Sequence, residues 1–328
     1  MKQKHALRLG SIAKQQLLAI LSLIILLVVF SILKPESFMT QVNFIGILQS
    51  TTVIGVLAIA TTFVIISSGI DLSIGVLMTF CAVISGVLLV NFQFPLWIGL
   101  ILVLITGGIT GAISGLAITK LNVPPFIATL GMMMLLKGLS LIITGTRPIY
   151  FMDVEGYDQL SLGSVMGEVF PSLPLPNGVL IFFAVAVFCG IILQKTILGR
   201  YTYALGSNEE AVRLSGVNID FWKVIIYSFS GAICGIAGLL ISSRLNSAQP
   251  ALGQGYELDA IAAVVIGGTS LRGGIGSING TVIGAFIMSV LINGLRIMSV
   301  AQEWQMVLTG IIIILAVYMD SLRAKIGP

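Results

Sequence analysis

Residues 96–118 read LWIGLILVLITGGITGAISGLAI, an apolar run without one charged side chain. The run exceeds the ~20 residues that a helix needs to cross the hydrocarbon core of a bilayer. Similar runs follow one another along the chain, at 17–33, 45–67, 74–91, 125–144, 178–194, 222–243, 258–268, 279–299 and 305–320. The pattern predicts an all-α polytopic membrane protein with about eight to ten transmembrane helices.

The composition supports a membrane protein. Of the 328 residues, 57% are hydrophobic and only 9% are charged, whereas soluble domains carry about 25% charged residues. The alternating ~10-residue segments that typify a β-barrel are absent. The net charge of +4 arises from basic residues beside apolar runs, so it indicates membrane topology and lipid contact rather than nucleic-acid binding.

Basic residues flank the apolar region, which extends over 17–320. Lys2, Lys4, Arg8 and Lys14 precede it, and Arg323 and Lys325 follow it. Because positive residues accumulate on the cytoplasmic side, we expect cytoplasmic tails at 1–16 and 321–328 and an even number of crossings. The first run could be a signal peptide, but Lys34-Pro35 follows it in place of a small-residue cleavage site, which favours an uncleaved span.

Two longer polar stretches are expected on opposite sides of the membrane. Residues 144–178 carry one base, Arg147, against four acids, Asp153, Glu155, Asp158 and Glu168. This acidic stretch is expected outside, and the stretch at about 195–221 is expected in the cytoplasm. The region between the two tails is expected to form a single transmembrane domain.

Glycines and short apolar runs indicate how the helices pack and where they break. Glycines recur at four-residue spacing, at Gly107/Gly111/Gly115, Gly231/Gly235 and Gly280/Gly284. Residues four apart share a helix face, so these stripes predict close helix packing, with a sliding interface as the alternative. The run at 258–268 is half a bilayer thick, and 69–73 interrupts another apolar stretch. Both features predict at least one broken or re-entrant helix.

The chain also shows weak internal similarity. GLAITKLN at 115–122 resembles GLLISSRLN at 238–246, and a proline follows each. Halves of transporters are often related by such repeats, so the match suggests an internal repeat.

The sequence lacks the groups that an enzyme would need. The only histidine is His5 in the basic tail, and the three cysteines lie in separate apolar runs. Metal-ligand spacings, nucleotide-binding loops and nucleophile motifs are missing. We therefore expect no catalytic residue, metal or cofactor.

A few polar side chains lie at expected membrane depth. Asp71 stands between two apolar runs, and Glu257 and Asp259 open the short run at 258–268. A charge inside the bilayer is costly, so each acid either caps a helix or faces the permeation route, and both readings stay open. The pathway-lining candidates are Asp71, Asn122, Arg244, Asn246, Gln249, Glu257 and Asp259.

The stretch TILGRYTYALGSNEEAVRLSGVN at 196–218 is the one long polar stretch expected on the cytoplasmic side. Asn208 is expected to cap a short helix and Gly216 to end it, while Gly199 and Gly206 are expected to allow sharp turns before it. Such a helix suits the groove of a partner protein, and an ordinary surface loop is the alternative. The residues singled out for this helix are Gly199, Asn208, Glu209, Glu210, Ala211, Arg213 and Gly216.

Within that stretch, LGRYTYALGSNEEAVRLSGV resembles the cytoplasmic coupling loop of ABC-importer permeases of the ribose and related monosaccharide type. SRLNSAQPALGQGYELDAIAAVVIGGTSLRGG, SSGIDLSIG and NVPPFIATLG resemble the same family. The resemblance runs from about residue 40 to residue 320. It implies a permease of the bacterial inner membrane that moves ribose or a related sugar inward.

The resemblance also implies partners. These are a second permease copy, an ATPase subunit with two nucleotide-binding domains, and an extracytoplasmic sugar-binding protein. Residues 208–213 would then dock into the ATPase, framed by Gly199 and Gly216. Two positions depart from the family pattern: Val212 stands where a second alanine is common, and Arg296 stands where ribose permeases often have asparagine. The second departure leaves the identity of the sugar open.

Two transport alternatives remain at this point, besides a protein that transports nothing, such as a membrane scaffold. The first is a secondary transporter driven by an ion gradient, although few ionisable residues are available within the spans to relay protons. The second keeps the ABC architecture and changes the cargo, to a furanose-like signalling molecule or a branched-chain amino acid.

Overall fold

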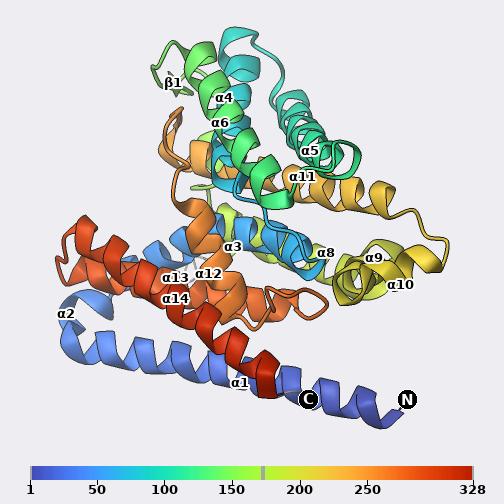
Figure 1. The fold of residues 1–328 in the computed structure, drawn as a ribbon. Helices are drawn as coiled ribbons and strands as arrows, with labels where there is room; N and C mark the ends of the chain where they lie inside the picture. The colour runs from blue at the N-terminus through green and yellow to red at the C-terminus, as the bar shows by residue number, and fades with distance from the viewer. Residues whose placement is uncertain (1, 171–173, 327–328) are drawn as a thin grey trace.

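The computed structural model describes residues 2–170 and 174–326, with side chains for 16–170 and 174–318, and it is helical almost throughout (Figure 1). The long helices are α1 (Lys2–Leu33), α3 (Gln41–Ile66), α4 (Ile74–Gly86), α5 (Leu96–Lys120), α6 (Pro125–Thr144), α8 (Asn177–Lys195), α11 (Ile219–Leu245), α13 (Ile278–Ile297) and α14 (Gln302–Ile326). The short helices are α2 (Pro35–Phe38), α7 (Val165–Val169), α9 (Ile197–Ser207), α10 (Glu209–Leu214) and α12 (Tyr256–Ile266).

Eight helices in the described part of the chain are long and apolar enough to cross a membrane. They are α1 from Gln16, α3, α4 with its π-helical extension η1 (Val87–Asn91), α5, α6, α8, α11 and α13. This number agrees with the expected eight to ten. α1 already begins at Lys2, so the expected N-terminal tail continues the first helix, and the side chains of 1–15 and of the tail at 321–328 lie outside the described residues.

The long helices run between two opposite ends of the molecule. α11 has 27 residues, which at 1.5 Å per residue separates its termini by roughly 40 Å. At its start, Lys120 of α5 pairs with Asp220 of α11 at 2.7 Å. Past its last turn, β2 (Ser247–Ala248) pairs antiparallel with β1 (Ile149–Tyr150). We call these the α10 end and the β1 end; in Figure 1 α9 and α10 lie at the right, and β1 and α2 at the left.

The other helices fit the same two ends. The Gln16 side chain of α1 donates to the Ser277 hydroxyl before α13 at 3.1 Å, which places both at the α10 end beside the loop that contacts α9. Phe30 of α1 packs on Phe38 and against Gly294 of α13, so these helices also meet again toward the opposite end. The long helices from α1 to α11 therefore alternate in direction, whereas α13 runs the same way as α11 because the short α12 lies between them.

The glycine stripes form close helix contacts, as predicted. A Cβ added at Gly111 of α5 would overlap the carbonyl oxygen of Tyr227 in α11, and Gly107 and Gly231 face each other in the same way. On α13, Gly280 and Gly284 make equivalent contacts with α12 and its end. Helices in lipid gain packing contacts when their backbones approach this closely.

The two segments of the suspected repeat have matching geometry at opposite ends. Asn122 follows α5 with φ of 53°, and Asn246 follows α11 with φ of 48°. Asparagine tolerates this left-handed conformation better than most residues. Because α5 ends at the α10 end and α11 ends at the β1 end, the two segments are inverted relative to each other.

Two helices are short or interrupted where the sequence predicted it. α3 ends at Ile66 and α4 begins at Ile74, so the break surrounds 69–73. α12 has 11 residues, about half of what a full crossing needs. α3 is buried from Thr51 to Ile66 among α8, α11, α12 and α13, and this central helix connects the α10 end to the core.

Candidate functional site

The polar stretch at 195–221 folds into α9 and α10. The Thr196 hydroxyl accepts a hydrogen bond from the Gly199 amide at 3.4 Å where α9 begins. The Asn208 side chain accepts from the Ala211 amide at 2.9 Å where α10 begins. Gly216 follows α10 with φ of 78°. The cap and the end of the predicted helix are therefore confirmed.

Gly199 and Gly206 do not make the sharp turns that the sequence suggested. Both lie inside the helix α9. A Cβ at Gly199 would overlap the carbonyl oxygen of Leu193, and a Cβ at Gly206 would overlap that of Ile66. The prediction of turns was wrong, because these glycines allow backbones to approach rather than to bend.

Gly206 belongs to a junction of three segments. The Gly274 amide donates to the Ile66 carbonyl at 2.8 Å. The Ser68 hydroxyl lies 3.2 Å from the carbonyl oxygen of Gly206 and 3.0 Å from that of Arg272. We call this arrangement of the α3 terminus, α9 and the loop at 267–277 the coupling junction.

Tyr203 of α9 makes a further contact in the coupling junction. Its hydroxyl donates to the Gly276 carbonyl at 2.7 Å. Burial raises the pKa of the Tyr203 phenol to about 12, so it keeps its proton and its donor role at neutral pH. α9 is thus fixed directly to the α3–α4 break and to the α12–α13 loop.

One ion pair holds α10 against α11, and a second lies within α10. Glu209 accepts from the Lys223 ammonium at 2.8 Å and faces the Arg213 guanidinium at 3.7 Å. The Lys223 side chain is only 21% exposed. Glu209 therefore contributes to the packing of α10 on α11, and its side chain stays 40% exposed.

The outer face of α10 is exposed. Val212 is buried against the rest of the protein, whereas Leu214 is 83% exposed. Glu210 and Arg213 present charges beside it. We call the face formed by Asn208, Glu210, Ala211, Arg213 and Leu214 the knob surface. It combines the apolar side chains of Ala211 and Leu214 with two opposite charges.

Asp71 is buried in the α3–α4 break. One carboxylate oxygen accepts from the Ser73 amide at 2.8 Å and from the Ser73 hydroxyl at 2.6 Å. Ser73, not Asp71, holds the N-cap position of α4, and it makes no side-chain capping bond. Asp71 therefore stabilises the turn before the helix rather than capping the helix in the usual way.

Glu257 and Asp259 lie in the first turn of α12, as expected. Glu257 accepts from the Gly255 amide with both oxygens, at 3.1 and 3.0 Å. Gly75 of α4 packs against Gly253 and the Glu257 carboxylate, so the starts of α4 and α12 meet. Glu257 thus acts at the N-terminus of α12, where the helix dipole favours a negative charge. Asp259 makes no ion pair within the described residues.

The remaining pathway candidates are spread over the molecule. The Arg244 guanidinium donates to the Gln49 carbonyl at 3.3 Å, and Asn246 ends α11. Gln249 lines an open groove of about 450 Å³ at the β1 end. Asn122 is exposed after α5, at the α10 end.

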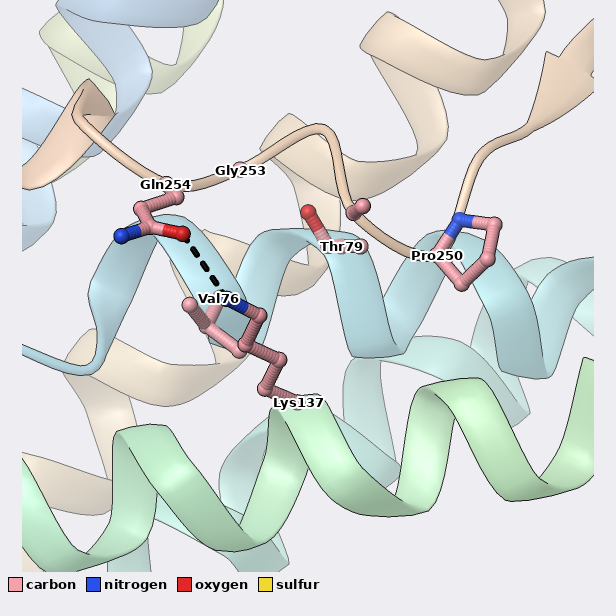
Figure 2. A pocket seen from close by; sticks show the side chains of 7 residues that line it. Val76, Thr79, Lys137, Pro250, Gly253 and Gln254 are labelled. Carbon is pink, nitrogen blue, oxygen red and sulfur yellow. Dashed lines mark hydrogen bonds between the residues drawn. The ribbon is translucent and has the colours of Figure 1, made fainter. Parts of the chain in front are cut away.

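Lys137 was missed by the sequence reasoning. It lies in the interior of the candidate span α6 and donates to the side-chain oxygen of Gln254 at 2.8 Å. Figure 2 shows Lys137 reaching from α6 to Gln254 on the loop that precedes α12. A lysine inside the apolar run LGMMMLLKGLSLII was a signal for this residue.

Comparison with known proteins finds relatives that align with nearly the whole chain and are all named as sugar import permeases. The chain is 40% identical over 305 residues to the ribose import permease protein RbsC of Haemophilus influenzae, covering 92% of this chain and 91% of the relative. It is 41% identical to RbsC of Bacillus subtilis, with 93% and 92% covered. It is 34% identical to the fructose import permease protein FrcC of Rhizobium meliloti, with 99% and 89% covered.

A family model covers most of the chain. Residues 43–317 match the model described as branched-chain amino acid transport system / permease component. No solved structure matches the chain. The match includes α9, α10, both helix breaks and Lys137. The chain therefore belongs to this family of transport-system permease components.

Proposed function

We propose that this chain is the membrane-spanning permease of an ATP-binding-cassette importer that moves a monosaccharide into a bacterial cell. The observation that carries the proposal is that full-length relatives are named as import permeases for ribose and fructose. The family description names branched-chain amino acids. The relatives that match over nearly the whole chain are instead named for ribose and fructose, which are polyhydroxylated solutes.

The α10 end faces the cytoplasm and the β1 end faces outward. The α10 end carries Lys120, Lys195 and Lys223 beside spans, as the positive-inside rule favours. Both termini then lie in the cytoplasm if α12 and α14 also run between the two sides, which gives ten passes. α12 supplies only part of its pass as a helix of 11 residues, and the loop at 249–255 leads to it from the outer side.

The knob surface docks into a groove of the ATPase subunit. Movement of the ATPase acts on α10, which Glu209 ties to α11. It also acts on α9, which the coupling junction ties to the α3–α4 break and the α12–α13 loop. The permease bends at the α3–α4 break and at the α12–α13 loop when it switches between opening inward and opening outward. These places bend at a lower cost than packed helices do.

The acidic stretch at 144–178 receives the solute-binding protein. The side chains of Asp153, Glu155, Asp158 and Glu168 are exposed there. Tyr157 anchors the stretch to α11, with its hydroxyl 2.6 Å from that of Ser242. A second copy of this permease completes the pathway, and the ATPase subunit supplies two nucleotide-binding domains.

Reconstitution tests the proposal. The permease is placed in proteoliposomes with its ATPase subunit and its solute-binding protein, and uptake of labelled ribose, fructose and xylose is measured. We expect uptake of at least one of these sugars that requires ATP and the ATPase subunit. Uptake driven by a proton or sodium gradient without ATP would overturn the mechanism, and ATP-driven uptake of leucine in place of every sugar would overturn the cargo.

A further inference from the structure

Among the lysine, arginine, aspartate and glutamate residues in the described part of the chain, Lys137 lies farthest from both ends of a candidate span. α6 has 20 residues, and Lys137 lies roughly 18 Å from its start and 10 Å from its end along the axis. A charge at this depth is costly in lipid, and such residues as a rule face a protein interior or an aqueous cavity.

No carboxylate compensates the charge of Lys137 among the described residues. The ion pairs there join Lys120 to Asp220, and Glu209 to Arg213 and Lys223. Lys137 has the neutral Gln254 amide as its partner. The Lys137 side chain is half-buried and Gln254 is exposed, so the pair lies on the surface of the subunit.

The pair adjoins the groove at the β1 end. Pro250 and Ala251 line both this groove and the small recess that contains Lys137 and Gln254. Leu141, one helical turn beyond Lys137 on the same face of α6, lines the groove as well. The narrow recess at Lys137 therefore adjoins the groove through Pro250 and Ala251, and Figure 2 shows Lys137 of α6 meeting Gln254 at that recess.

We propose that Lys137 and Gln254 form a contact point for the hydroxyl groups of the transported sugar. The inference rests on the proposed function and names residues for its solute path. An ammonium group offers three donors, and a glutamine amide offers donors and an acceptor, which suits a ring of hydroxyls without binding it tightly. Thr79 adds a hydroxyl to the wall of the same recess.

Thiol labelling tests whether the pair faces water. The three native cysteines are buried, so K137C or Q254C can be labelled by an anionic thiol reagent in the reconstituted complex over a low background. The matched control is L135C. Leu135 is 61% exposed on the same helix, but two residues correspond to a rotation of about 200°, so it lies on nearly the opposite face from Lys137. We expect K137C and Q254C to react and L135C to stay protected. Equal, low reactivity at all three positions would overturn the proposal.

Transport measurements test contact with the sugar. In K137M we expect ATP-driven sugar uptake to fall by about tenfold, the order expected for a lost hydrogen bond to a charged group. Assembly with the ATPase and its basal hydrolysis should stay unchanged, and K137R should keep most of the uptake. The ratio of ribose to fructose uptake should also change in K137M.

A different pattern is expected if the Lys137–Gln254 hydrogen bond only holds α6 to the loop before α12 and neither side chain contacts the sugar. In that case Q254L would reproduce K137M, the double variant would be no worse than either, and the ratio between sugars would stay fixed. That pattern would overturn the contact. If the wild-type complex moves no sugar with ATP, the proposed function fails by itself, whereas the labelling pattern still shows whether Lys137 faces an aqueous path.

Discussion

The two ends of the molecule use their charges in opposite ways. Every ion pair among the described residues lies at the α10 end, where Lys120, Lys223 and Arg213 meet acidic partners. At the β1 end, the acids of 144–178 form none. Charges at the α10 end fix helices to one another, and charges at the β1 end stay available. This difference agrees with the roles proposed above, in which the α10 end transmits movement through fixed contacts and the β1 end attracts a partner by its charges.

The largest effect should come from filling the coupling junction. Gly206→Ala places a methyl group against the Ile66 carbonyl and the Gly274 amide, which are backbone atoms that cannot rotate away. Overpacking of this kind costs about 1–3 kcal/mol, and we expect ATP-driven uptake to fall by about tenfold or more. Gly190→Ala in α8 is the matched control, since no atom lies within 4 Å of the added Cβ.

Uptake and ATP hydrolysis should be measured together in both glycine variants. If the junction transmits movement, Gly206→Ala hydrolyses ATP without matching transport, whereas Gly190→Ala resembles the wild type. Normal uptake in Gly206→Ala would show that the rigid α10 end is not needed for coupling.

A smaller effect should follow from reversing one charge on the knob surface. Glu210 is exposed and makes no ion pair in the described chain, so Glu210→Lys breaks none of the ion pairs that hold α10, although it places a positive charge in the first turn of the helix. We expect affinity for the ATPase subunit to fall by about tenfold, equivalent to ~1.4 kcal/mol. Glu168→Lys at the β1 end is the control, and it should bind the ATPase normally. Equal binding by the two variants would remove the knob surface as the docking site.

The converse experiment reverses the acids of the β1 end. In the triple variant D153K/E155K/D158K we expect the solute-binding protein to associate more slowly, by about threefold to tenfold at low salt, because steering by opposite charges is lost. The difference from wild type should shrink as ionic strength rises. Surface-based binding measurements on the reconstituted permease give both quantities. An unchanged association rate would show that these acids do not attract the solute-binding protein.

The sequence predicted those features that depend on local patterns. Apolar run lengths predicted the spans, and the α3–α4 break and the short α12 followed from interrupted hydropathy. Asn208 was identified as a cap and Gly216 as a stop because these roles depend on a few adjacent residues. The spacing of Gly107, Gly111 and Gly115 predicted a close helix contact, although not the partner helix.

The sequence could not predict features made by distant segments. Gly206 looked like a turn residue because nothing nearby in the chain indicates that Ile66 and Gly274 pack against it. The ion pair of Glu209 could not be predicted because its partner Lys223 lies in the next helix. Lys137 stood out only by its charge, and its relation to Gln254 required the return of the loop before α12.

The smallest effect should distinguish the two neighbouring glutamates of α10. Glu209→Gln removes the charge that faces Lys223, a pair that is partly exposed, and such pairs contribute about 0.2–1 kcal/mol. We expect a fall in thermal midpoint of about 1–2 °C for a chain of this size, while Glu210→Gln should leave the midpoint unchanged. Binding to the ATPase should show the reverse order, with Glu210→Gln weakened more than Glu209→Gln. If Glu209→Gln instead loses ATPase binding without losing stability, then Glu209 is presented to the partner, and the ion pairs of the α10 end are not what holds the knob surface in place.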